Sequence, residues 1–240
     1  MRASQLNVVI EEMRHLLSGD KTGHSDAHVM RTYNISINLC EKERADKEIV
    51  ALAALLHDVD DYKIFGQKSA DELTNAYKIM NESGIKPDMQ VKVAEIIKTM
   101  GYSKLLTGVR PTTIEGKIVS DADMCDGIGV NGILRWHEFA ICKGQDLFSK
   151  AVFPTKIVSV DDYKSTSQNP KGKNYYAIEH VFEKLLKLES LMLTKSGKKE
   201  AKKRQRIMVD FLREFFREND APDWNKYLDD YLMGIEGTLV

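Results

Sequence analysis

The stretch IVALAALLHDVDD, from Ile49 to Asp61, joins eight apolar residues to a histidine and three aspartates. The apolar part has no polar face, which in a soluble chain is typical of a central helix covered by other helices. A histidine and a carboxylate at the end of a buried helix lose their hydration on folding and need partners that offset this cost. The stretch therefore predicts both a buried helix and a site at its end.

The rest of the chain carries the same helical signal. Apolar residues recur with a period of about 3.6 residues, and no convincing set of strands with alternating polarity is found, so we expect an all-α protein. Residues 143–173, which contain Pro154 and Pro170, are expected to form a long loop. Helices are expected over about residues 3–17, 25–42, 46–58, 113–126, 131–142, 175–192 and 198–217, on both sides of residues 84–87, and in a short tail after Pro222.

Length and composition favour one soluble domain. The chain has 240 residues and a mass of 27.3 kDa, which predicts a single domain over residues 1–240 with a core from about 24 to 217. The formal net charge of -1 provides no overall field that would attract nucleic acid or an anionic membrane. We therefore expect neither as a partner, and the sequence leaves the oligomeric state, a homodimer included, open.

The cysteines and the N-terminus indicate a cytoplasmic protein. Cys40, Cys125 and Cys142 are odd in number and show no CxxC spacing, so neither a disulfide framework nor a thiolate zinc site is expected. We expect all three to pack in the core or between helices. No apolar run is long enough to cross a membrane, and no basic leader precedes one.

A metal ion is the partner that best suits His57 and Asp58. Imidazole nitrogen and carboxylate oxygen are both ligands of first-row metal ions. Neighbouring residues on a helix point about 100° apart, so both can reach one ion only near a helix end. Further ligands must come from other segments. Two segments offer them, HSDAHVMRTYN (24–34), with Arg31 three residues after His28, and SDADMCDGIGVNG (120–132), with Asp126 three residues after Asp123.

The ordered set His28, His57-Asp58 and Asp123 resembles the H…HD…D signature of the HD-domain metal-dependent phosphohydrolases. The segments GHSDAHVMRT, ALAALLHDVDDYK, TIEGKIVSDADMCDGIGVNGI and IEHVFEKLLKLESLM together resemble the small bacterial single-domain branch of that superfamily. The resemblance covers about His24 to Arg217. It implies an HD-domain helical bundle that binds a divalent metal ion and hydrolyses phosphate compounds.

The resemblance also implies roles for individual residues. His28, His57, Asp58 and Asp123 would bind one divalent ion, with manganese preferred and magnesium, cobalt, nickel, iron or zinc as alternatives. No histidine occurs between Asp58 and Asp123, where two-metal HD phosphodiesterases draw further ligands, so a single ion is expected. The ion would lower the pKa of bound water and polarise a phosphoryl oxygen.

Side chains beside these ligands would serve the substrate and the proton. Arg31 would neutralise phosphate charge. Asp61 or Asp126 would hold the attacking water or relay its proton, and the sequence does not rank the two. His24 could bind phosphate or be an ordinary histidine at a helix start.

More distant candidates lie in the second half of the chain. His180 matches a histidine in similar proteins and could face the substrate, but an exposed helix residue is the interpretation that we favour. Lys171 and Lys173, in the loop NPKGKNYY, could close over an anion. The basic run from Leu193 to Arg206 is interpreted as a solvated helix face, because no base-reading motif accompanies it.

These residues predict a metal-dependent phosphohydrolase that acts on a small phosphorylated compound, foremost a nucleotide. The leading hypothesis is hydrolysis of a nucleoside triphosphate to the monophosphate and pyrophosphate. One alternative is a nucleoside 5′-monophosphate phosphatase, and another is a non-catalytic nucleotide-sensing module. The complete ligand set argues against the last, since a retired site has no need to keep all four groups.

Overall fold

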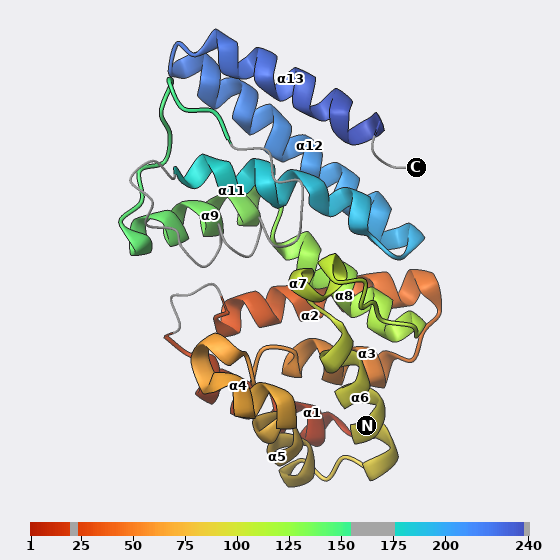
Figure 1. Ribbon diagram of the computed structural model, residues 1–240. Coiled ribbons are helices and arrows are strands. Elements are labelled where there is room, and N and C mark those ends of the chain that lie inside the picture. The colour runs from red at the N-terminus through yellow and green to blue at the C-terminus, as the bar shows by residue number, and fades with distance from the viewer. Residues whose placement is uncertain (20–23, 155–175, 238–240) are drawn as a thin grey trace. The chain divides into compact units, whose positions relative to one another are not determined.

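The computed structural model describes residues 1–19, 24–154 and 176–237 (Figure 1). Over these ranges the regular structure is helical and no strand occurs, which confirms the prediction of an all-α protein. The helices are α1 (Ala3–Leu17), α2 (Asp26–Glu43), α3 (Lys47–Leu56), α4 (Tyr62–Glu72), α5 (Thr74–Glu82), α6 (Pro87–Thr99), α7 (Tyr102–Leu106), α8 (Ile114–Asp126), α9 (Gly129–Lys143), α11 (Ala177–Glu183), the 3₁₀ helix η1 (Leu185–Leu191), α12 (Lys195–Glu218) and α13 (Pro222–Gly237).

The chain forms two compact units, which we describe separately. The first consists of Met1–Asp126 together with Leu193–Gly197, and the second of Gly127–Met192 together with Lys198–Val240. That the whole chain folds as one domain stays a prediction.

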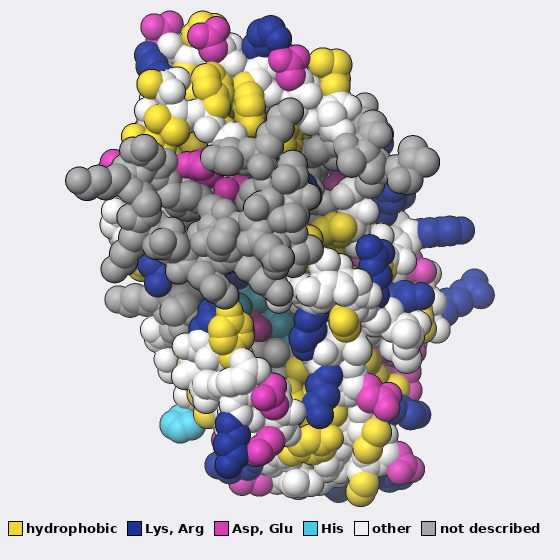
Figure 2. All heavy atoms as spheres, in the orientation of Figure 1, with side chains coloured by type: hydrophobic (Ala, Val, Ile, Leu, Met, Phe, Trp, Pro, Cys, Tyr) yellow, Lys and Arg dark blue, Asp and Glu magenta, His cyan; other side chains and the backbone are white. Residues whose placement is uncertain are grey.

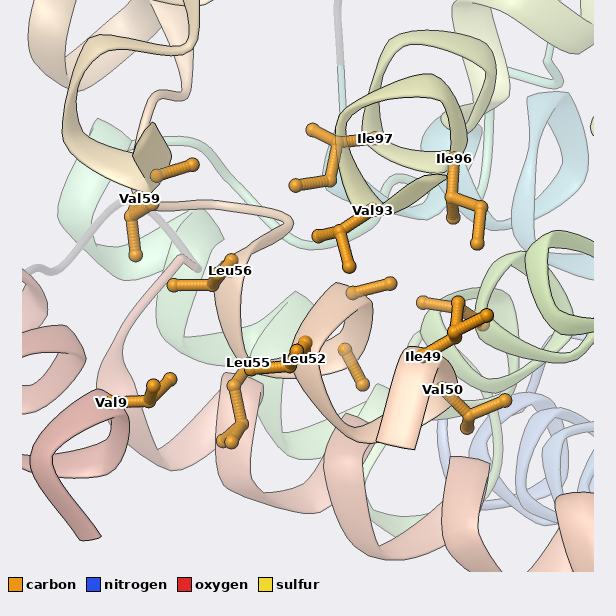
Figure 3. Packing of buried hydrophobic residues seen from close by; sticks show 14 of the residues in the cluster. Val9, Ile49, Val50, Leu52, Leu55, Leu56, Val59, Val93, Ile96 and Ile97 are labelled. Carbon is orange, nitrogen blue, oxygen red and sulfur yellow. The ribbon is translucent and has the colours of Figure 1, made fainter. Parts of the chain in front are cut away.

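Helix α3 is the centre of the first unit. Every residue from Ile49 to Leu56 is buried, as the apolar pattern predicts. Figure 3 shows side chains of α1 and α6, among them Val9 and Val93, pointing toward Leu55 and Leu52 of α3. Helices α2 and α8 pack against α3 and against each other. Burial of each large aliphatic side chain contributes about 1.5–3 kcal/mol, so this packing fixes the position of α3 firmly.

Capping determines where α3 begins and ends. The Asp46 side chain accepts hydrogen bonds from the backbone amides of Glu48 at 2.9 Å and Ile49 at 3.3 Å, which satisfies two amides of the first turn. The helix ends at Leu56, with His57 as its C-cap residue. His57 and Asp58 therefore lie immediately after the buried helix, where the chain leaves the core.

Two local features differ from the sequence-based expectation. Helix α4 was not predicted, and no residue of it is buried, so it has no apolar stripe to reveal it. Its first turn is separated from the rest by Gly66, whose φ of 81° favours glycine. The single helix expected over 175–192 is instead α11 followed by η1, and Lys184 between them has a non-helical φ of -131°.

The second unit has an aromatic core. Phe148 contacts Phe216 and Trp224, with ring centroids 5.7 Å and 5.0 Å apart. The indole of Trp136 on α9 donates a 2.7 Å hydrogen bond to the carbonyl of Ala177, which fixes the start of α11. The tail helix expected after Pro222 is α13, whose Trp224 is buried in this core.

The surface fits a chain with almost no net charge. On the face shown in Figure 2, basic and acidic side chains are interspersed. No helix in the described part of the chain is long and apolar enough to cross a membrane. Cys40 and Cys125 are buried as expected, but Cys142 is exposed. The packing role predicted for Cys142 is wrong, because the inward residues of α9 include Trp136 and Ala140 instead.

A buried carboxylate ties α8 to the start of α12. Asp121 accepts hydrogen bonds from the backbone amides of Leu193 and Thr194, both at 2.8 Å, and from the Thr194 hydroxyl at 2.7 Å. Glu43 at the end of α2 accepts a 2.8 Å hydrogen bond from the amide of Ser196. The segment Leu193–Gly197 thereby holds α8, which carries Asp123 and Asp126, against α2.

Replacement of Gly197 by alanine should disturb this junction. A Cβ atom at position 197 would lie 2.1 Å from Oδ2 and 2.8 Å from Cβ of Asp121, which cannot move without losing its hydrogen bonds. We expect Gly197→Ala to lower the free energy of unfolding by about 1–3 kcal/mol, measured by chemical denaturation. The control is Gly234→Ala, since Gly234 is helical and has nothing near its missing Cβ. Equal stability of both variants would contradict the close contact.

Candidate metal centre

The four side chains that the sequence predicts as metal ligands lie together, close to one end of each of three helices. His28 lies in the first turn of α2, His57 and Asp58 directly follow α3, and Asp123 lies in the last turn of α8. His28 Nε2 is 3.3 Å from His57 Nε2, 3.4 Å from Asp58 Oδ2 and 3.3 Å from Asp123 Oδ1. His57 Nε2 is 3.3 Å from Asp58 Oδ2 and 3.8 Å from Asp123 Oδ1. We call these four residues the His–Asp cluster.

The distances suit a shared metal ion. Ligand atoms that each lie about 2.1 Å from one ion are separated by about 3–3.5 Å from one another. The ligand atoms of His28, His57 and Asp58 all lie within 4.8 Å of one another. Two imidazole nitrogens and two carboxylate oxygens form a donor set that first-row divalent ions accept. The residues present therefore fit the ion that the sequence predicts.

Hydrogen bonds orient both imidazoles with Nε2 toward the cluster. Nδ1 of His28 lies 2.7 Å from Asp126 Oδ2, and Nδ1 of His57 lies 2.9 Å from the carbonyl oxygen of Ala54. Both partners accept, so each Nδ1 carries the proton and each Nε2 is left to bind a cation. Two unprotonated Nε2 atoms at 3.3 Å cannot bond to each other, which is a second reason to place a proton or a metal ion between them.

The electrostatics of the cluster favour positive charge. Burial opposes the charged form of His57, but the negative charge and hydrogen bond of Asp58 outweigh it and raise the pKa of His57 to about 9. Burial likewise opposes ionisation of Asp58, but the charges of His57 and His24 hold the pKa of that carboxyl well below its usual value. The cluster therefore keeps its carboxylate charged and attracts a cation.

Asp126 and Arg31 lie behind His28. The Asp126 carboxylate is fully buried and accepts hydrogen bonds from Arg31 Nε at 2.7 Å and Nη2 at 3.0 Å, in addition to the one from His28. This contact is made on the Nδ1 side of the ring, opposite the Nε2 atom that faces the cluster. The geometry thus supports Asp126 as a positioning residue for His28 more than as the base that holds water.

Asp61 and His24 lie beside Asp58. Nδ1 of His24 is 2.9 Å from Asp58 Oδ2, and ligand atoms of His24, Asp58 and Asp61 lie within 4.8 Å of one another. Asp61 Oδ1 accepts a 2.9 Å hydrogen bond from the backbone amide of Lys63 and so caps α4. Of the two candidates for the base, Asp61 is the one that borders the cluster.

Asp60 has a different role from the neighbouring aspartates. Its carboxylate is buried and accepts hydrogen bonds from the Ser69 hydroxyl at 2.5 Å and from the amides of Asn75 and Ala76 at 2.9 Å and 2.8 Å. These contacts satisfy the first turn of α5. Asp60 therefore stabilises the fold. Its side chain binds α5, whereas those of His57 and Asp58 belong to the His–Asp cluster.

For three of the predicted substrate residues the role stays a prediction. Lys171 and Lys173 lie outside the described residues. His180 lies on α11 in the second unit, where it is half-buried. Conversely, the sequence-based interpretation gave no role to Lys63, although it follows the aspartates directly in HDVDDYK. Only the backbone turn capped by Asp61 brings its amine beside His24, 3.5 Å from Nε2.

Comparisons with known proteins agree with this geometry. A family model described as HD domain matches residues 26–128, a range that contains the whole His–Asp cluster. The chain is 30% identical over 211 residues to YpgQ of Bacillus subtilis, an uncharacterized protein, and the match covers 88% of this chain and 90% of that protein.

Solved structures show the same fold. A crystal structure from Lactobacillus plantarum matches with a TM-score of 0.75 and 28% identity, over 92% of this chain and 99% of that chain. An HD-superfamily hydrolase from Bacillus thuringiensis matches with a TM-score of 0.67 and 28% identity, over 90% of this chain and 97% of that one. The complex of Bacillus subtilis YpgQ with ADP matches with a TM-score of 0.64 and 28% identity, over 87% and 97% of the two chains.

Metal affinity should rise with pH, and the pKa of His57 should determine the pH range over which it rises. With a pKa of about 9, His57 carries a proton in the metal-free cluster at neutral pH. A metal ion binds only the neutral imidazole, so binding must expel about one proton. The association constant for Mn²⁺ should increase up to about tenfold per pH unit and level off above the pKa of His57.

Calorimetry of chelator-treated protein, in buffers of different ionisation enthalpy, measures both the association constant and the number of protons released. The control is His15→Ala, which removes an exposed histidine of α1 and should leave the pH dependence unchanged. An association constant that does not vary between about pH 6 and 8 would show that His57 is not charged in the metal-free protein.

Proposed function

This chain belongs to the HD-domain phosphohydrolase superfamily, and we propose on that premise that it hydrolyses a nucleoside triphosphate to the monophosphate and pyrophosphate. It is a hydrolase of the HD superfamily. The observation that carries the proposal is the His–Asp cluster, which joins two oriented imidazoles to two carboxylates at the end of a buried helix.

The four residues of the cluster would hold one divalent ion. Such an ion, when bound, lowers the pKa of water and polarises a phosphoryl oxygen. The side chain of Asp123 is 28% exposed and that of His24 20%, whereas those of His28 and His57 are 3% and 4% exposed. A substrate phosphate would therefore approach from the side of Asp123 and His24.

Asp61 is the residue proposed to hold the proton of the attacking water. Its Oδ1 caps α4 through the amide of Lys63, and its Oδ2 remains for the water. Fixing one carboxylate oxygen to the backbone orients the other, as a positioned general base requires.

Arg31 is proposed to neutralise substrate phosphate. Its Nε and Nη2 are held by Asp126, and this bidentate contact fixes the plane of the guanidinium. The Arg31 side chain is 32% exposed, so Nη1 can donate to an anion near the cluster. Arg31 would thus link the substrate to the residue that orients His28.

The nucleotide bound by a similar protein supports a nucleotide substrate. YpgQ, to which this chain is similar over most of its length, has been crystallised with ADP. A nucleoside monophosphate phosphatase would use the same cluster and stays the second candidate. A nucleotide-sensing module without activity would leave the ordered ligands unexplained.

Product analysis separates these candidates. The protein is incubated with a panel of nucleoside triphosphates and monophosphates in the presence of Mn²⁺, Mg²⁺, Co²⁺, Ni²⁺ or Zn²⁺. Pyrophosphate together with a monophosphate supports the proposal. Orthophosphate together with a free nucleoside supports the phosphatase, and binding without turnover supports the sensing module.

Two substitutions should separate the ligand from the base. Asp61→Asn keeps an oxygen that can cap α4 but removes the basic carboxylate, so we expect it to retain metal and to lose turnover by about 10²-fold or more. Asp58→Ala removes a ligand and should lose both metal and turnover. The measurements are elemental analysis and steady-state kinetics. If Asp61→Asn turns over at the wild-type rate, Asp61 is not the base; if Asp58→Ala keeps its metal, the cluster is not the metal site.

A further inference from the structure

Lys63 places a positive charge next to the His–Asp cluster. Its backbone is fixed by the 2.9 Å hydrogen bond from its amide to Asp61 Oδ1, so it shares a turn with the proposed base. Its Nζ lies 3.5 Å from Nε2 of His24, and Nδ1 of His24 lies 2.9 Å from Asp58 Oδ2. A continuous polar path therefore runs from the metal ligand Asp58 through His24 to the Lys63 amine.

The two ring nitrogens of His24 contact different groups. Nδ1 of His24 donates to the Asp58 carboxylate, and Nε2, on the other side of the same ring, is the atom that Lys63 Nζ approaches. The Lys63 ammonium group has three N–H groups, and its single contact with His24 leaves at least two of them for another acceptor. No carboxylate of the described residues lies within ion-pair distance of Lys63, whose other contact is with the ring of the adjacent Tyr62.

We propose that Lys63 binds the phosphate group adjacent to the one that reacts, so that the site favours phosphoanhydrides over phosphate monoesters. This inference rests on the proposed function and names the part of the substrate that this residue recognises. Lys63 is a specificity residue in this scheme, and His24 is the positioning residue that directs its amine.

The chemistry of the two substrate classes explains the expected preference. A phosphate monoester has a single anionic group, which a metal ion bound in the cluster and Arg31 would be sufficient to hold. A triphosphate carries further anionic groups beside the reacting phosphorus, and they need additional donors. An ammonium group with two unused N–H groups at the edge of the cluster meets that need, because hydrogen bonds between charged groups are the stronger ones.

A binding experiment tests the inference without turnover. Manganese-loaded protein is titrated with inorganic pyrophosphate and, separately, with orthophosphate in a calorimeter. We expect Lys63→Ala to weaken pyrophosphate binding about tenfold and to leave orthophosphate binding within about twofold, as the loss of one charge-assisted hydrogen bond predicts. Metal content, measured in parallel, should not change.

The matched control is Lys68→Ala, which removes the same charge from an exposed position of the same helix. Lys63→Arg, which keeps the charge, should recover part of the lost affinity. Lys63→Ala and Lys68→Ala that bind pyrophosphate equally well would overturn the inference. Equal weakening of pyrophosphate and orthophosphate by Lys63→Ala would also overturn it, because the residue would then not distinguish the two.

Kinetics give the second readout. For a nucleoside triphosphate, Lys63→Ala should raise KM about tenfold and change kcat by less than about twofold. If the wild-type protein hydrolyses no nucleotide, the proposed function fails, but the pyrophosphate titration still decides the role of Lys63. If the wild-type protein is active and Lys63→Ala has the wild-type KM, only the inference about Lys63 fails.

Discussion

The burial of polar ligands at the end of an apolar helix is the constraint on which the site depends. Residues Ile49–Leu56 of α3 are surrounded by α1, α2, α6 and α8, and the chain leaves this core at His57 and Asp58. Imidazole and carboxylate groups in this position are costly unless they bind one another or a cation. The same packing that stabilises α3 therefore also places together charged and polar groups whose cost of burial a metal ion would offset.

The residues around the cluster hold its side chains in a defined geometry. Asp126 and the Ala54 carbonyl hold the Nδ1 atoms of the two imidazoles, so that both Nε2 atoms face inward. Arg31 compensates the buried charge of Asp126. A metal site formed in this way would be preorganised, because its ligands would keep their rotamers and His57 would lose only its proton when an ion binds.

Four closely spaced residues of one short segment have four different roles. In HDVDDYK, Asp58 is a proposed metal ligand, Asp60 caps α5, Asp61 caps α4 beside the cluster, and Lys63 contacts His24. The chain turns sharply after α3, so neighbouring side chains point in different directions. This geometry lets acidic residues of the same type serve the fold and the site separately, and it places a cation within reach of the proposed substrate.

The sequence by itself determined that the protein is all-α, that α3 is its central helix and that His28, His57, Asp58 and Asp123 belong together. Hydrophobic periodicity is a local property, so it can be read from the chain directly, whereas the grouping of the four ligands came from the resemblance of their order to the HD signature. Only the tertiary structure decided that Asp126 orients His28, 98 residues away in sequence, that Asp60 stabilises α5, and that Lys63 contacts His24. These partnerships depend on how α2, α4, α5 and α8 pack, and a hydrogen bond requires positions accurate to a few tenths of an ångström, which no sequence pattern encodes.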